Sequence, residues 1–219
     1  MAPASAADLS APLPVDPSAQ VVPRGLPLGM DMAVLRARPS AQGDEIALVA
    51  DGDVLRDGRG NPAAGDKIKI VLRPETACYV YVVGIDGSGL VRSLFPPAPG
   101  YDPRPVMPSR DYTIPQGREW AALDEVRGVE TLYVIASPEP RPDLDQALKA
   151  FEVRPRSIGP ITAKVEEPAI LPADYREMEK GRSASIDLES GRRLQVPTHT
   201  YVAAQAGEAL RLTRWFRHE

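Results

Sequence analysis

The residues best suited to covalent chemistry are one cysteine and two histidines. Cys78 is the only cysteine, and His199 and His218 follow much later in the chain. A cysteine nucleophile needs a base within hydrogen-bond reach and surroundings that lower its pKa. Cys78 instead stands in an Ala-Cys-Tyr-Val-Tyr run that is typical of a strand, and free cysteine is among the most buried residue types. We therefore predict no catalytic residue and no enzyme; a Cys-dependent hydrolase remains the second alternative function.

The sequence offers no donor set for a metal or a cofactor. Zinc would need cysteine and histidine at ligand spacing, which the chain lacks. Asp51, Asp53 and Asp57 could suggest calcium, but no glycine stands at the sixth position of this loop and no glutamate closes it. The glycine-rich segment 84–89 lacks the Lys-Ser/Thr of a phosphate-binding loop, so we interpret it as a hairpin turn. We predict no metal ligand, no cofactor-binding residue and no cofactor.

Two groups of residues form a candidate interaction surface instead. One is an apolar subsegment near the N-terminus, and the other joins arginines to a tryptophan near the C-terminus, a combination that makes cation and stacking contacts. A solvated linker and a solvated strand face are the alternatives for these two groups. The predicted surface consists of Leu26, Leu28, Met30, Met32 and Leu35 from the first group, Arg211, Arg214 and Trp215 from the second, and Tyr101 in addition to both.

Composition excludes two classes of partner. The 26 basic and 30 acidic residues give a net charge of −4, so the chain has no electrostatic case for binding nucleic acid. A membrane-spanning helix needs about 18 or more consecutive apolar residues, and no such run occurs, so no membrane span is predicted. The 24 prolines indicate tails, turns and connections, since proline disrupts helices and central strands.

The chain divides into three predicted parts. Residues 1–40 are interrupted by prolines and lack a hydrophobic period, which predicts a Pro/Ala-rich tether. Residues 41–160 contain alternating and β-branched runs, and they predict a β-sandwich-like accessory domain. Residues 161–219 predict a C-terminal β extension, either separate or packed on the same core, with a short helix over 174–180.

The predicted fold is therefore mainly β, with one short packed helix. The strongest strand patterns are at 45–50, 67–72, 77–83, 90–95 and 131–136. Asp86-Gly-Ser-Gly89 predicts a hairpin turn between the third and fourth of these. The helix is predicted to begin at Asp143, with the carboxylate as its N-cap.

A set of short motifs in the centre of the chain resembles a known domain family. The motifs are Gly65-Asp66, Tyr79-x-Tyr81, Asp86-x-x-Gly89-x-Val91, Leu94-Phe95-Pro96, Tyr112-x-Ile114-Pro115, Gly128-x-Glu130 and Ile135-Ala136-Ser137. Residues 44–153 resemble a bacterial β-rich family of unknown function, often appended to caspase-like peptidases or serine/threonine kinases or found alone behind a signal peptide. The resemblance implies an accessory domain and carries over no catalytic residue.

These observations predict a non-enzymatic protein-binding or structural subunit of a bacterial cell-envelope or secreted assembly. Its partner is expected to be another protein, bound through the N-terminal tether or an exposed strand edge. A ligand-binding sensor for a glycan, peptide or lipid is the first alternative. The small-residue start of the chain favours a periplasmic or secreted location, with a cytoplasmic protein as the alternative.

Overall fold

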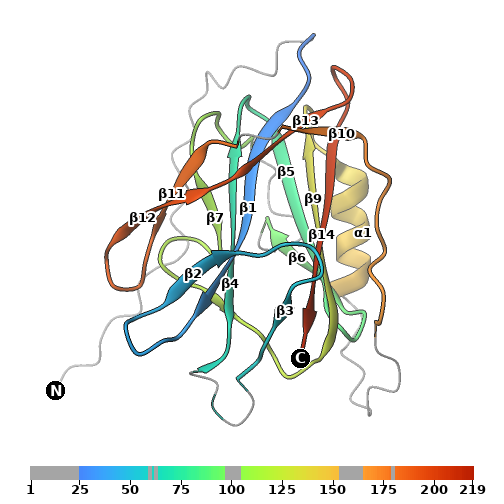
Figure 1. Ribbon diagram of the computed structural model, residues 1–219. Coiled ribbons are helices and arrows are strands. Elements are labelled where there is room, and N and C mark those ends of the chain that lie inside the picture. Colours follow the sequence, from blue (N-terminus) through green and yellow to red (C-terminus); the bar gives the residue numbers. More distant parts are fainter. Residues whose placement is uncertain (1–24, 59–60, 62–63, 97–104, 153–164, 179–180) are drawn as a thin grey trace, which may run out of the picture.

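The computed structural model describes residues 25–58, 61, 64–96, 105–152, 165–178 and 181–219. This part of the chain is mainly β, as predicted, and contains two packed sheets, a two-stranded hairpin and one helix (Figure 1). In chain order the elements are β1 (Gly29–Arg38), β2 (Glu45–Leu48), β3 (Val54–Leu55), β4 (Lys67–Pro74), β5 (Tyr79–Ile85), β6 (Val91–Phe95), β7 (Tyr112–Ile114), β8 (Ala121–Ala122), β9 (Gly128–Ser137), α1 (Pro142–Glu152), β10 (Tyr175–Met178), β11 (Ser183–Asp187), β12 (Arg193–Pro197), β13 (His199–Ala203) and β14 (Leu210–His218).

The two sheets enclose one hydrophobic core. The first has the strand order β10-β13-β1-β4-β7, with β2 added to β1 and β8 to β4; the second has the order β3-β14-β9-β5-β6. Buried apolar side chains from both sheets meet between them, among them Met32 of β1, Val82 of β5 and Phe216 of β14. The β11–β12 hairpin covers the outer face of the first sheet, where Ile186 packs near Leu35 in a second cluster.

Strand β1 shows that part of the segment 1–40, predicted to be a tether, belongs to the folded core. Met30, Met32 and Val34 point into the core between the sheets, while Ala33 and Leu35 point into the cluster under the hairpin. Because alternate side chains of a strand face opposite sides, β1 is buried on both faces and is a central strand. The prediction was wrong for residues 29–38, and residues 1–24 lie outside the described part of the chain.

The C-terminal segment supplies a strand to each main sheet. β13 pairs antiparallel with β1, with Gly29 opposite Val202. β14 lies between β3 and β9 and pairs with β9 along its whole length, from Leu210 opposite Ala136 to His218 opposite Gly128. Both strands bury side chains in the common core, so residues 199–218 complete the same sandwich.

The predicted hairpin and the predicted packed helix are both present, but the helix starts earlier than expected and a second predicted helix is a strand. β5 and β6 form the expected hairpin, where the Asp86 carboxylate accepts hydrogen bonds from the backbone N–H groups of Ser88 and Leu90. The helix α1 is present, but it begins at Pro142, before Asp143. The helix predicted over 174–180 is instead the strand β10 at residues 175–178, because pairing with β13 overrides the local helix preference of Arg-Glu-Met.

Within the described residues, no helix has the length and apolar character needed to cross a membrane.

Candidate functional site

One side of the sandwich brings two strand edges into contact. β10 ends the first sheet, and β14 has only the two-residue β3 beyond it in the second sheet. β10 and β14 contact each other across the space between the sheets. We call this strip the open side and define it as β10, residues 210–216 of β14, the turn 50–53 and the segment 170–174.

Two carboxylates from elsewhere in the chain cap the edge of β14. Asp174 Oδ1 accepts a hydrogen bond of 3.3 Å from the backbone N–H of Arg211, and Asp51 Oδ1 accepts one of 3.0 Å from that of Trp215. In return, the carbonyl of Trp215 accepts a hydrogen bond from Gly52 N at 3.1 Å. These side chains occupy backbone groups that would otherwise be available to another strand.

Arg214 lies on the inner face of β14, between the two sheets. Its guanidinium stands 4.8 Å above the centre of the Tyr201 ring, donates a hydrogen bond to the Tyr201 hydroxyl, and donates another of 2.8 Å to the carbonyl of Thr213. Asp51 completes the arrangement with an ion pair of 3.5 Å. Burial raises the pKa of Tyr201 despite the opposing effect of Arg214, so the hydroxyl stays neutral. The arginine thus joins the two sheets and the turn 50–53.

Gly52 allows this turn to approach β14. Its φ is +87°, which L side chains rarely adopt, and a Cβ at this position would lie 3.3 Å from the Trp215 indole. Asp53 closes the turn by accepting a hydrogen bond from Ala50 N. The half-buried Trp215 therefore packs on the turn, and the turn places Asp51 beside Arg214.

Two hollows flank the Arg214–Asp51 pair, and both residues line both of them. The larger has a volume of about 330 Å³ and is walled by largely apolar side chains, including Ile170, Leu171, Pro172, Tyr175 and Trp215. The smaller, about 210 Å³, has an apolar floor with a polar rim and includes Met32, Val34, Leu48, Glu177, His199 and Tyr201. At its rim, His199 Nδ1 lies 2.9 Å from Glu177 Oε1.

The outer edge of β10 differs from the edge of β14, because its backbone groups remain free. Ala204 N donates a hydrogen bond to Asp174 O, and the register continues as Arg176 opposite Val202. In an antiparallel ladder, alternate residues bond to the neighbouring strand. The N–H and C=O groups of Tyr175 and Glu177 therefore point away from β13, and no described residue hydrogen-bonds to them.

Exposed apolar side chains gather around the same strip. Five large hydrophobic residues are exposed in the described part of the chain: Leu26, Leu48, Val54, Ile170 and Met178. Ile170 and Met178 belong to the open side, and Leu48 lines the smaller hollow next to it, whereas Val54 lies beyond the strip in β3, opposite Arg217 of β14. Such clustering is typical of a protein interaction surface. The open side therefore combines free main-chain groups with apolar contact area.

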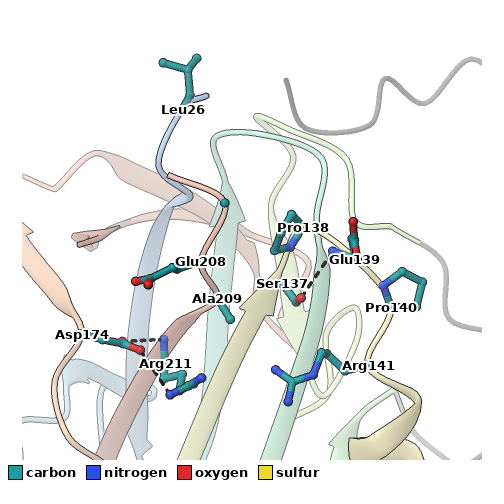
Figure 2. A pocket seen from close by; sticks show the side chains of 11 residues that line it. Leu26, Ser137, Pro138, Glu139, Pro140, Arg141, Asp174, Glu208, Ala209 and Arg211 are labelled. Carbon is teal, nitrogen blue, oxygen red and sulfur yellow. Dashed lines mark hydrogen bonds and ion pairs between the residues drawn. The ribbon is translucent and has the colours of Figure 1, made fainter. Parts of the chain in front are cut away.

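A second concave surface lies where β9 ends and β14 begins (Figure 2). This end pocket has a volume of about 740 Å³ and takes its walls from residues near 26, 137–141, 174 and 207–211. Figure 2 shows Arg211 beside Asp174 on one side and Arg141 on the other. Both arginines are already paired, Arg141 with Asp143 at 2.6 Å and Arg211 with Asp174 at 3.6 Å.

The structure divides the predicted interaction surface instead of uniting it. Four of its residues are buried in β1 or just before it, and this part of the prediction was wrong: Leu28, Met30, Met32 and Leu35. Arg214 and Trp215 lie on the open side, Leu26 lines the end pocket, and Arg211 belongs to both. Tyr101 lies outside the described residues. The sequence missed β10 and Ile170, whose grouping depends on the fold and has no local pattern.

Cys78 is poorly placed for nucleophilic chemistry. It is buried, and burial raises the pKa of its thiol to about 12, so at neutral pH it stays protonated. The register of β5 and β14 on β9 places Cys78 beyond one end of β9 and His218 at the other. At about 3.4 Å per residue, the length of β9 separates them far beyond hydrogen-bond reach.

The aspartates considered for calcium serve the local structure. Asp51 and Asp53 accept backbone hydrogen bonds at the turn, and Asp57 lies 3.5 Å from Arg127. The described residues contain no group of three or more His, Cys, Asp or Glu side chains placed to hold a metal ion.

Comparison with known proteins finds a family that matches the centre of the chain. Residues 63–140 match the family described as a domain of unknown function (DUF4384). The match confirms the resemblance to an uncharacterised domain family and covers β4 through β9. β1, β10, β13 and β14 fall outside residues 63–140, and so does every part of the open side. No curated protein and no solved structure matches the chain.

Proposed function

We propose that this protein is a non-enzymatic binding module that holds another protein at its open side. The observation that carries the proposal is the coincidence, on one strip, of the backbone edge of β10, to which no described residue bonds, with the exposed hydrophobic residues Ile170 and Met178 and the adjacent Leu48. Main-chain donors and acceptors give a partner polypeptide a place to bond, and exposed apolar area gives it contact energy. The buried core between the two sheets supports both features.

The wider setting of the proposal is a bacterial cell-envelope or secreted assembly. The resemblance of the central segment to accessory modules that accompany peptidases and kinases, or stand behind signal peptides, supports this setting. Fractionation of the native host with an antibody to the full chain tests it: recovery with the periplasmic or secreted fraction is expected, and recovery in the cytoplasm contradicts the location.

The interaction itself is tested by affinity capture of the tagged full-length protein from its native host, with partners identified by mass spectrometry. Met178→Asp places a charge on the open side, and Leu26→Asp places the same charge on an exposed apolar residue at the end pocket. We expect a stoichiometric partner that Met178→Asp loses and Leu26→Asp retains. Because both side chains are exposed, both variants should fold normally.

A sensor for a small ligand is the second candidate function, and the end pocket favours it. Its volume of about 740 Å³ lies within the range of small-molecule sites, and arginines approach it from two sides. If Leu26→Asp lost the partner and Met178→Asp retained it, the protein would be bound at the end pocket instead of the open side. Failure to recover any partner with the unmodified chain would contradict the binding module and favour the sensor, which ligand-dependent thermal stabilisation would then identify.

A further inference from the structure

We propose that the partner at the open side is an extended segment of a different polypeptide, which adds to β10 as a further strand and carries the pattern apolar–acidic–apolar. This inference rests on the proposed function and defines the chemistry of its partner. It follows from three features of β10: the direction of its backbone groups, the hollows beside it, and the charge at its centre.

The backbone of β10 specifies where the added strand bonds. Tyr175 and Glu177 each direct one N–H and one C=O away from β13, which gives four main-chain groups at a spacing of two residues. This is the repeat that one strand presents to the next. The neighbouring edge of β14 is unavailable to such a strand, because Asp51 and Asp174 occupy its donors at Trp215 and Arg211.

The hollows specify the first and third residues of the partner's pattern. Side chains directly opposite each other on neighbouring strands point to the same face of the sheet. Tyr175 faces inward and contacts Tyr201 edge to face, and Glu177 shares its face. Partner residues opposite these two therefore point toward the hollows beside Arg214. Ile170 and Trp215 in one and Leu48 in the other favour apolar side chains.

The middle residue of the pattern lies opposite Arg176. This arginine is exposed and points to the outer face of the sheet, opposite to Tyr175 and Glu177. Opposite charges on directly facing strand residues are stabilising, whereas like charges are destabilising. An aspartate or glutamate between two apolar residues therefore suits this edge. The pattern is the same in both chain directions, so it holds for either strand orientation.

The positive charge of Arg176 also disfavours a second copy of this chain as the partner at β10. Two copies of β10 related by a two-fold axis would pair antiparallel, and residues facing each other would be on the same face of the sheet. Using the free groups of both Tyr175 and Glu177 requires these two residues to face each other across the interface. That register places the two copies of Arg176 opposite each other. The resulting repulsion points to a different chain.

Fluorescently labelled peptides test the pattern directly, with anisotropy as the measure of binding to the full chain. The probe Ser-Thr-Leu-Glu-Leu-Thr-Ser carries the pattern, and Ser-Thr-Leu-Lys-Leu-Thr-Ser reverses the central charge. We expect the acidic peptide to bind about fivefold more tightly or better, because each favourable cross-strand charge pair contributes up to about 1 kcal/mol. Arg176→Glu should invert the preference. Equal binding of both peptides, or no binding of either, overturns the inference.

A second pair of variants tests strand addition separately from side-chain contacts. Glu177→Pro removes the outward N–H of residue 177, and proline is tolerated on an edge strand where its missing N–H faces solvent. Glu177→Ala removes the same carboxylate and keeps the N–H. We expect Glu177→Pro to weaken the acidic peptide about tenfold relative to Glu177→Ala, as loss of one such hydrogen bond implies. Equal affinities for the two variants would mean that no strand is added.

Affinity capture of the host partner with these variants distinguishes failure of strand addition from failure of the proposed function. A partner lost by Met178→Asp and by Glu177→Pro, and kept by Glu177→Ala, supports both. A partner lost by Met178→Asp but kept by Glu177→Pro overturns strand addition and leaves the open side as the interface. A chain that sediments as a dimer at micromolar concentration, and as a monomer after Glu177→Pro, would identify a second copy as the occupant and overturn the choice of a different chain.

Discussion

The edges of β14 and β10 lie on the same side of the sandwich, but they differ in whether their backbone groups are hydrogen-bonded by other described residues. Asp51, Asp174 and Arg214 bond to the backbone of β14, so that strand offers few free groups. No described residue bonds to the outward groups of Tyr175 and Glu177 in β10, which is flanked by exposed apolar side chains. An exposed strand edge invites association unless it is shielded. Among the described residues one edge is shielded and its neighbour is not, so of these two edges β10 is the one suited to a partner.

The difference predicts that substitutions at the edge of β14 affect stability, whereas those at β10 affect binding. The variants below test that division, beginning with the largest expected change in the free energy of unfolding.

Arg214→Met should lower the free energy of unfolding most, by about 2–3 kcal/mol. Methionine keeps much of the apolar stem but loses the hydrogen bonds to the Tyr201 hydroxyl and the Thr213 carbonyl and the contact with the tyrosine ring. Urea denaturation followed by tryptophan fluorescence measures the change. Arg176→Met on β10 is the matched control, and a similar loss in both variants would contradict the division between the two edges.

Gly52→Ala should cost about 2 kcal/mol, since it combines an unfavourable backbone angle with a close approach to Trp215. Gly207→Ala separates the two causes. Its φ of +81° is similar, but nothing lies within 4 Å of the added Cβ, so about 1 kcal/mol is expected from backbone strain alone. Thermal and urea unfolding of both proteins measure the difference; equal losses would show that contact with Trp215 does not position the turn.

Asp51→Ala and Asp174→Ala should each lower the free energy of unfolding by about 1 kcal/mol, because each leaves a backbone donor of β14 without its acceptor. They should also increase concentration-dependent association, since the edge of β14 becomes accessible. Urea denaturation and light scattering measure the two effects. Glu208→Ala, an exposed carboxylate at the end pocket, should change neither, and unchanged scattering in the aspartate variants would argue against a shielding role.

The smallest effect on stability is expected at β10 itself. Arg176→Ala and Met178→Ser should leave the free energy of unfolding within about 0.5 kcal/mol, because both side chains are exposed. The same urea measurement applies. A loss above 1 kcal/mol from either variant would mean that β10 is stabilised by contacts of its own side chains, and the contrast with β14 would disappear.

The central strands were predictable because their patterns are local. β4 begins with the alternating run Lys-Ile-Lys-Ile, Tyr79–Ile85 is rich in β-branched and aromatic residues, and Asp86 supports the turn between β5 and β6. β1 was missed because prolines surround it and Gly-Met-Asp-Met-Ala contains no β-branched residue. Its burial depends on β4, β13 and the hairpin, all of which follow it in the sequence.

The sequence indicated some residue types of the candidate site, but it did not indicate how they are arranged. Arg214 and Trp215 stood out as an arginine beside an aromatic, but strand alternation places them on opposite faces of β14. Their contacts with Asp51 join residues more than 160 positions apart. β10 resembled a helix because Arg, Glu and Met favour helices, and its pairing with β13 decides otherwise. No local pattern indicates which strand will end a sheet.

The place of β1 has a consequence for how the chain is made. Among the described strands a ribosome produces β1 first, whereas its neighbour β13 and the second sheet's β14 are the last two. Neither main sheet is complete until β13 and β14 have been synthesised, so we expect the core to close only after both strands are available. For the same reason, a fragment cut at residues 63 and 140 has neither β1 nor β14 to close its core. We therefore expect residues 63–140, although recognisable as a unit of sequence, to need the flanking strands in order to fold.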